Sequence, residues 1–142
     1  MIDRDSWETP DNLWNKLNDQ YNFIIDCCAS LENRKTGISF DCFEKVEGLS
    51  EGICWMNPPF SKAYEMFKHF FKVVSKGVAI YRCDNMETKV WQEQILKHAS
   101  WIFIFNKRIQ YTGQEGKGAR FPSALIGFNV PEPNLKNGKL LK

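Results

Sequence analysis

The chain has 142 residues, of which 43% are hydrophobic and 14% aromatic, so it can bury one core but is short for two domains. Its formal net charge is +2, too mild to mark a strongly basic nucleic-acid binder and no bar to a polyanionic partner. We expect one folded domain over residues 1–130 and a polar C-terminal tail over residues 131–142.

Five cysteines without any CxxC pair indicate free thiols in a reducing cytoplasm. Only two histidines are present, which argues against a metal site. The polar, acidic start MIDRDSWETPDN does not resemble a signal peptide, and no apolar run reaches the roughly 18 residues of a membrane span. The sequence therefore predicts a cytoplasmic protein without metal or membrane association, and it does not indicate an oligomeric state.

The first half of the chain alternates helical and strand patterns. Thr9 is a candidate N-cap for a helix over residues 10–19, which has leucines one turn apart. The apolar run at residues 23–29 predicts a buried strand, and the irregular polar stretch after it predicts a loop with a short strand near residues 38–43. A further short strand, at residues 53–56, is ended by two prolines.

The second half continues this alternation. Apolar residues at helical spacing predict a helix over residues 62–77 that stops at Gly77, and another over residues 86–98. Three further strands are predicted, at residues 78–83, 101–105 and 122–129. Helices between buried apolar strands are typical of an α/β sandwich with a largely parallel sheet, which is the fold class that we predict.

The stretch Asn57-Pro58-Pro59-Phe60 follows the strand at residues 53–56. Proline fixes φ and restricts the residue before it, so this turn is rigid. It presents the Asn57 side-chain oxygen and the Pro58 carbonyl as two neighbouring acceptors beside the flat ring of Phe60, an arrangement that suits an NH2 group on a base. The alternative is a plain structural stop, with Asn57 as a turn residue and Phe60 in the core.

The NPPF turn and its surroundings resemble the small phage-encoded DNA N6-adenine methyltransferases of the Dam type. The segments that carry the resemblance run in the same order over residues 7–129: WETPDNLWNKLNDQYNFIIDCCASLEN, GLSEGICWMNPPFS and FNKRIQYTGQEGKGARFPSALIGF. The resemblance implies a Rossmann-like class I methyltransferase fold and a site-specific, adenine-specific DNA methyltransferase that uses S-adenosylmethionine. For a phage protein, it also implies location in the host cytoplasm.

The resemblance also implies roles for individual residues. The catalytic turn would consist of Asn57, Pro58, Pro59 and Phe60. The cofactor would be bound by Trp7, Thr9, Pro10, Asp26, Cys28, Ala29 and Asp41. For Asp26, the structural alternative is a cap or an ion pair with a lysine.

A basic stretch near the Gly-rich segment is a candidate for contact with double-stranded DNA. It consists of Lys107, Arg108, Tyr111, Lys117 and Arg120. A chain of this length leaves no room for a separate recognition domain, so we expect loops beside the pocket to bind DNA. A solvated basic turn is the alternative interpretation.

Two other functions remain compatible with the same residues. Similar turns serve methyltransferases that act on RNA adenine, cytosine N4 or a protein glutamine amide, because all of these groups are flat amines. A catalytically inactive nucleic-acid-binding relic is the other possibility. Comparing methyl transfer to DNA, RNA and protein distinguishes the first possibility from a DNA methyltransferase. Binding of S-adenosylhomocysteine distinguishes the second, because a relic is expected not to bind it.

Overall fold

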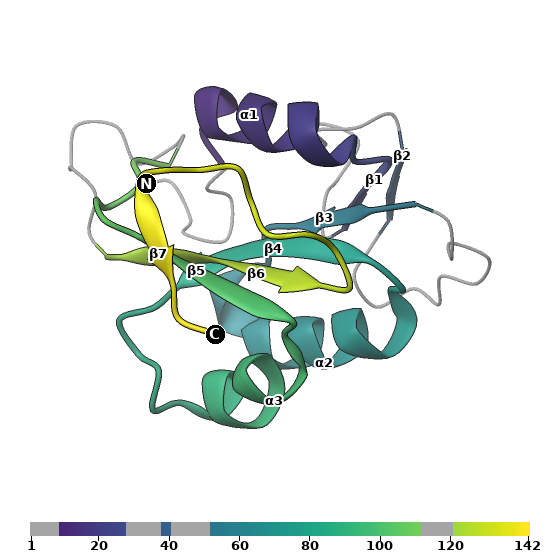
Figure 1. Ribbon diagram of the computed structural model, residues 1–142. Helices are drawn as coiled ribbons and strands as arrows, with labels where there is room; N and C mark the ends of the chain where they lie inside the picture. Colours follow the sequence, from purple (N-terminus) through teal and green to yellow (C-terminus); the bar gives the residue numbers. More distant parts are fainter. Residues whose placement is uncertain (1–8, 28–37, 41–51, 112–120) are drawn as a thin grey trace, which may run out of the picture.

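A computed structural model describes residues 9–27, 38–40, 52–111 and 121–142 of the chain (Figure 1). The strands are β1 (Ile25–Cys27), β2 (Ile38–Phe40), β3 (Cys54–Met56), β4 (Gly77–Arg82), β5 (Trp101–Phe105), β6 (Ser123–Phe128) and β7 (Gly138–Leu140). The helical segments are α1 (Asp11–Tyr21), the 3₁₀ turn η2 (Phe60–Lys62), α2 (Ala63–Val73), the π-helical turn η3 (Val90–Ile95) and α3 (Leu96–His98). These elements form the predicted α/β domain.

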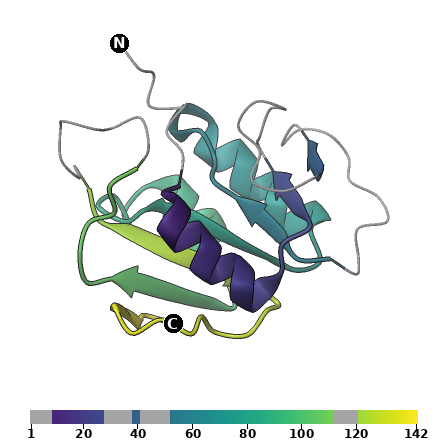
Figure 2. The ribbon, with the colours of Figure 1, turned by 90° about the horizontal axis from the view of Figure 1, so that it is seen from above.

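The strands form one sheet in the order β2-β1-β3-β4-β6-β5-β7. Helix α1 covers one face of this sheet, and α2, η3 and α3 cover the other (Figures 1 and 2). Both faces are therefore buried, which explains why strands such as β3 and β4 are apolar along nearly their whole length.

The sheet is mixed, whereas the sequence predicts a largely parallel one. Strands β2, β1, β3 and β4 pair in parallel, but β4 with β6, β6 with β5 and β5 with β7 pair antiparallel. A parallel neighbour requires a crossover, usually a helix, and the sequence between β5 and β6 has no helical pattern. Because β6 runs against both β4 and β5, these two strands share the direction of β1 and β3.

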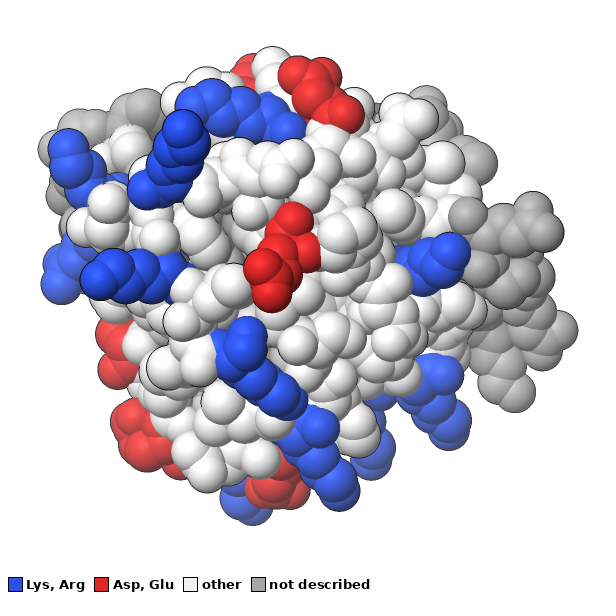
Figure 3. Space-filling view, in the orientation of Figure 1, with Lys and Arg blue, Asp and Glu red and all other residues white. Residues whose placement is uncertain are grey.

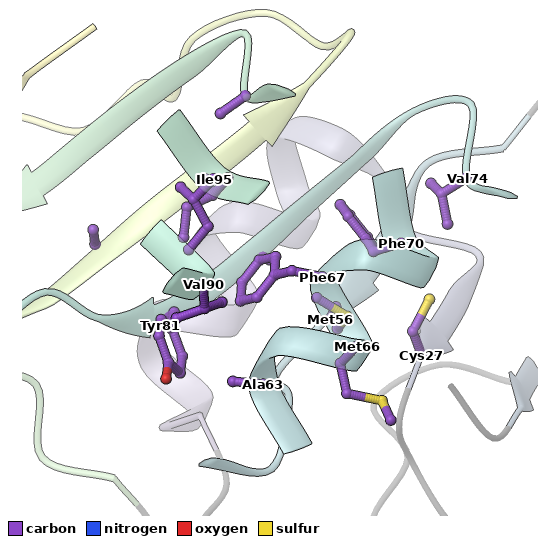
Figure 4. Close-up of a cluster of buried hydrophobic side chains, with 14 of the residues drawn as sticks. Cys27, Met56, Ala63, Met66, Phe67, Phe70, Val74, Tyr81, Val90 and Ile95 are labelled. Atoms are coloured by element: carbon purple, nitrogen blue, oxygen red, sulfur yellow. The ribbon is translucent and has the colours of Figure 1, made fainter. Parts of the chain in front are cut away.

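Alternate residues of β3 supply the two halves of the core. Cys54 and Met56 belong to the cluster beneath α2 and η3, whereas Trp55 belongs to the cluster beneath α1. Figure 4 shows Phe67 of α2 with Val90 of η3 in the first cluster. Burial of large side chains on both faces fixes the register of β3, and with it the position of the turn that follows.

Helix α1 confirms the helix predicted for residues 10–19, with shifted ends. Pro10 is the N-cap, so the helix begins one residue later than predicted and extends to Tyr21. It ends where Asn22 adopts a left-handed φ of 59° and donates its backbone N–H to the Asn18 carbonyl. Asparagine tolerates this conformation better than most residues, which accounts for the sharp stop.

The prediction that Gly77 stops the second helix is wrong. Helix α2 ends at Val73, and Gly77 is the first residue of β4. A Cβ atom at Gly77 would lie 2.4 Å from the Phe70 ring and 3.2 Å from the Cys54 carbonyl oxygen. Glycine is therefore required because helix α2 and strand β3 approach β4 closely, and not because a helix ends there.

Gly77→Ala is expected to destabilise the protein by roughly 1–3 kcal/mol, because the added methyl group overpacks a rigid contact between helix and sheet. The free energy of unfolding in urea measures this effect. Ser75→Ala, a similar small change two residues earlier, serves as the control. Equal stabilities of the two variants would show that the packing around Gly77 can relax.

The helix predicted over residues 86–98 begins at Val90, four residues later than expected. Its first turn is π-helical and buries Trp91 completely. The Trp91 Nε1–H donates to the backbone carbonyl of Arg82 at 3.0 Å, which ties this helix to the end of β4. The wider turn thus places a large anchoring side chain against the sheet.

The segment from Val130 to the C-terminus packs against the domain. Gln20 donates to the Glu132 carbonyl at 2.8 Å and accepts the Asn134 N–H at 2.7 Å, and the Tyr21 hydroxyl donates to the Pro131 carbonyl at 2.6 Å. Strand β7 then adds to the edge of the sheet beside β5. The sequence did not predict this strand, because GKL carries no strand pattern.

Candidate active site

The strands β1, β3, β4 and β5 end at the same edge of the sheet, since they run in one direction. In register, Cys27 of β1 lies beside Met56 of β3, which lies beside Ala79 of β4. The NPPF turn follows Met56 directly, so it lies at this carboxyl edge. Ligands of open α/β sheets bind outside the carboxyl ends of strands, so this edge is the candidate active site.

The turn itself is held by its prolines. Pro58 is buried, and Pro59 has φ −64° and ψ 136°, values typical of proline in extended backbone. The Pro59 carbonyl accepts the Lys62 N–H at 3.2 Å and so begins the 3₁₀ turn. The Pro58 carbonyl, one residue earlier, lies outside these helical hydrogen bonds. Asn57, the residue that joins the end of β3 to Pro58, is half-buried.

Phe60 belongs to an aromatic cluster at the same edge. Its ring meets Tyr81 of β4 edge-on at 5.9 Å and Phe121 at 5.2 Å between centroids. Phe121 in turn packs against Tyr111 at 5.5 Å. Phe60 is half-buried rather than enclosed, so this ring lies at the boundary between the core and the sheet edge.

Arg82, the last residue of β4, covers part of this cluster. Its guanidinium carbon lies 5.4 Å from the centroid of Phe60 and 4.8 Å from that of Phe121. The guanidinium also makes two hydrogen bonds to the carboxylate of Asp84, at 2.7 and 2.6 Å. This bidentate pair holds a cation over the aromatic rings. Neither residue was among the predicted site residues, although Arg82 lies near the end of the strand predicted at residues 78–83 and Asp84 directly follows it.

The ion pair with Arg82 favours the ionised form of Asp84. The hydrogen bonds from Arg82 lower the pKa of this carboxyl group, and the charge of Arg108 lowers it further. The same hydrogen bonds raise the pKa of Arg82. Arg108, in the segment after β5, is therefore close enough to influence the end of β4.

Asp84→Asn is expected to lower the free energy of unfolding by roughly 0.2–1 kcal/mol at neutral pH, because the pair is partly exposed. The folded-state pKa of Asp84 is depressed, so this stabilisation is present above the ordinary carboxyl pKa of about 3.9 and is lost as the pH falls through the lower folded-state value. Urea unfolding at pH 7, 5 and 3 measures it, with Glu87→Gln as control. A difference from wild type that grows on acidification would contradict the assignment.

Asn85 supplies a buried acceptor near the cluster. Its side-chain oxygen Oδ1 makes no hydrogen bond to the described residues. Its backbone carbonyl accepts the N–H and the hydroxyl of Thr88, at 3.1 and 2.8 Å, so the residue is held in place. Burial raises the pKa of Tyr81, and a hydrogen bond from Asn85 opposes this rise. Asn85 thus lies beside the hydroxyl of Tyr81, whose ring packs on Phe60.

The structure describes three of the seven residues assigned to the cofactor. Asp26, in the middle of β1 beside Trp55 of β3, is only 4% exposed. Thr9 is buried, and its hydroxyl makes no hydrogen bond within the described part of the chain, while Pro10 is half-buried. The other four lie outside the described residues: Trp7, Cys28, Ala29 and Asp41.

Each of these two polar groups has the chemistry that the amino-acid end of S-adenosylmethionine requires. A buried carboxylate suits an ammonium group, and an unpaired buried hydroxyl can donate to a carboxylate. Leaving such a hydroxyl without a partner costs roughly 1–3 kcal/mol, which a bound polar ligand would recover.

The residues predicted to bind DNA are distributed over surface and core. Lys107 and Arg108 are exposed after β5. Tyr111 is 2% exposed, and its hydroxyl lies 2.9 Å from Ser123 Oγ in a hydrogen bond, so its ring supports Phe121 and does not face solvent with the basic residues. Lys117 and Arg120 lie outside the described residues.

A metal centre and a membrane-spanning segment are two other features to consider in the described residues. No group of three or more His, Cys, Asp or Glu side chains among them is arranged to hold a metal ion. None of the helices in the described ranges is long and apolar enough to span a membrane.

The fold and the site define an α/β domain with an acceptor-bearing turn and an aromatic cluster at the carboxyl edge of its sheet. Over residues 1–124 the sequence matches the family described as DNA N-6-adenine-methyltransferase (Dam). The chain belongs to this family, as the resemblance predicted. A search of the curated proteins gave no match.

Proposed function

We propose that the protein transfers the methyl group of S-adenosylmethionine to the N6 amine of adenine in double-stranded DNA. The observation that carries this proposal is the position of the turn from Asn57 to Phe60. It follows β3 at the carboxyl edge, and the neighbouring strand β1 holds the buried carboxylate of Asp26. Membership in the DNA adenine methyltransferase family supports the same reaction.

In this proposal, the turn activates the amine. The lone pair of the adenine N6 amine is delocalised into the ring, which makes the amine a poor nucleophile. Asn57 Oδ1 and the Pro58 carbonyl oxygen accept one amine hydrogen each, which favours a pyramidal nitrogen with an exposed lone pair. No general base is needed, because the nitrogen releases its proton to solvent after it has become cationic.

The target base must leave the duplex to reach this turn. Phe60, half-buried beside the acceptors, would stack on the flipped adenine. Tyr81 and Phe121 pack against the Phe60 ring in T-shaped contacts, so the stacking surface would be rigid before the base arrives. A rigid surface reduces the ordering cost of binding.

The cofactor would lie beside the turn. Asp26 would accept hydrogen bonds from its ammonium group, and the hydroxyl of Thr9 would bind its carboxylate, with Pro10 at the start of α1 beside them. When bound, S-adenosylmethionine supplies an electrophilic methyl group on a sulfonium. Trp7, Cys28, Ala29 and Asp41 complete the proposed set, as the resemblance implies.

We also propose that the domain is a Rossmann-like class I methyltransferase fold. Five of the seven strands run in one direction, with helices on both faces, which supports this assignment. The antiparallel strand β6 lies between two of them. Lys107 and Arg108 would contact DNA phosphates, together with Lys117 and Arg120.

Nucleoside mass spectrometry tests the reaction. Unmethylated duplex DNA, RNA of the same sequence and a glutamine-containing peptide are each incubated with the protein and S-adenosylmethionine, and Asn57→Ala serves as the control for contaminating enzymes. N6-methyladenine in DNA with the wild type alone is the expected result. Methylated RNA or peptide, or N4-methylcytosine in the DNA, would mean that the methylated group is not the N6 amine of adenine in DNA. Failure to bind S-adenosylhomocysteine in calorimetry would indicate an inactive relic.

A further inference from the structure

A polar groove runs between α1 and the C-terminal segment. It consists of two adjoining hollows of about 250 and 630 Å³ that share Lys16, Ile109, Leu135 and Asn137 in their walls. Its walls come from three parts of the chain: the start of α1, the segment after β5 and the segment that leads into β7. The groove therefore exists only because the chain beyond Val130 folds back against α1.

The groove is basic. The described residues that line it include four cations, namely Lys16, Lys107, Arg108 and Lys136, and no carboxylate. These four charges exceed the net charge of +2 of the whole chain, so the remaining residues sum to −2. Figure 3 shows Lys and Arg side chains gathered where Figure 1 places α1 and the start of β7. The groove thus carries a local concentration of positive charge, although the net charge of the whole chain is small.

The walls of the groove are fixed by hydrogen bonds that do not involve the cations. Gln20 of α1 bonds to the backbone of Glu132 and Asn134. The Asn106 N–H donates to the Asn137 carbonyl at 2.8 Å, which joins the segment after β5 to the segment before β7. A ligand would meet a surface that is already formed, and binding would not have to order it.

The groove also lies on the same side of the molecule as the catalytic turn. It opens at the carboxyl end of β5, and β5 runs in the direction of β3, so both sites are at one edge of the sheet. Arg108, in the wall of the groove, influences Asp84, whose partner Arg82 covers the Phe60 ring. A polyanion in the groove would therefore lie at the same edge of the sheet as Phe60.

We propose that this groove binds the phosphate backbone of duplex DNA beside the flipped base, with Lys16 and Lys136 as contacts in addition to Lys107 and Arg108. The inference rests on the proposed function, because it assigns the groove to the same DNA substrate. Side-chain amides such as Asn106 and Asn137, which also line the groove, donate hydrogen bonds to phosphate oxygens. The C-terminal segment, beyond the part of the chain that matches the family, would thus take part in substrate binding.

The test measures the affinity for a fluorescent DNA duplex as a function of salt, by anisotropy. The double variant Lys16→Gln/Lys136→Gln removes two groove charges, and Lys72→Gln/Lys76→Gln removes two exposed charges from the end of α2 and the loop before β4. If both groove lysines contact phosphates, the slope of log K against log salt falls by about 1.8, and binding weakens roughly 10- to 100-fold near 50 mM salt. The control pair should leave the slope unchanged.

Several outcomes would overturn the proposal. Equal losses in the two double variants would mean that only the net charge matters, and an unchanged slope in the groove variant would exclude the groove. Duplex RNA that binds through the groove more tightly than duplex DNA would also exclude DNA as the occupant. The methylation assay is scored separately: product with an unchanged slope rejects the groove alone, whereas groove-dependent DNA binding without product rejects the methyltransferase reaction alone.

Discussion

Asn57→Ala is expected to lower the single-turnover rate of methyl transfer by about 10²- to 10³-fold, the range found when one preorganised hydrogen-bonding group of an active site is removed. The reason is that the amine would lose one of the two acceptors that hold its hydrogens. Affinity for the DNA duplex should change by less than a few fold, because backbone contacts dominate binding. Rapid-quench methylation and anisotropy measure the two quantities.

Two further variants sharpen this prediction. Asn57→Asp keeps an oxygen acceptor at the same place and should retain more activity than Asn57→Ala. Asn15→Ala, an exposed change on α1, should behave like the wild type. If Asn57→Ala lost DNA affinity and stability in proportion to its rate, Asn57 would be a structural turn residue rather than a catalytic one.

Trp91→Ala is expected to lower the free energy of unfolding by roughly 3–5 kcal/mol, since it leaves a large cavity in a fully buried site. It also removes the hydrogen bond to the Arg82 carbonyl at the end of β4. A domain of this size has a total stability of about 5–15 kcal/mol, so the variant approaches global unfolding. Urea denaturation followed by circular dichroism measures the loss.

Trp91→Phe separates the packing of this residue from its hydrogen bond. Phenylalanine fills much of the cavity but leaves the Arg82 carbonyl without its donor, so a loss of roughly 1–3 kcal/mol is expected. A loss below 1 kcal/mol in Trp91→Ala would mean that η3 collapses onto the sheet and that Trp91 does not anchor it.

The positions of the main elements follow from local patterns in the sequence. Strands β3, β4, β5 and β6 lie within two residues of their predicted bounds, because short apolar runs can be buried in this fold only as strands. The turn at Asn57 was likewise visible, since two consecutive prolines lack the N–H groups that would continue a strand within a sheet. Membership in the DNA adenine methyltransferase family followed from motifs in their order along the chain.

Helix bounds and strand direction were harder to predict. Gly77 resembled a helix stop in the sequence. This glycine is explained instead by the close packing of α2 against β4, which only the folded chain reveals. The antiparallel strand β6 has the same apolar pattern as its parallel neighbours, so periodicity does not distinguish them.

The surroundings of the turn depend on contacts between distant residues. Phe60 meets Phe121 across 61 positions of sequence, and Lys16 shares a groove with Lys136 across 120. A local pattern carries the period of a helix or strand but no information on which elements become neighbours. The amino-acid order alone thus specified strands β1 to β6, the acceptor-bearing turn and the family. Packing of the sheet, α1 and the C-terminal segment brought Arg82 over the aromatic rings and gathered the four cations, because those contacts form only when the core closes.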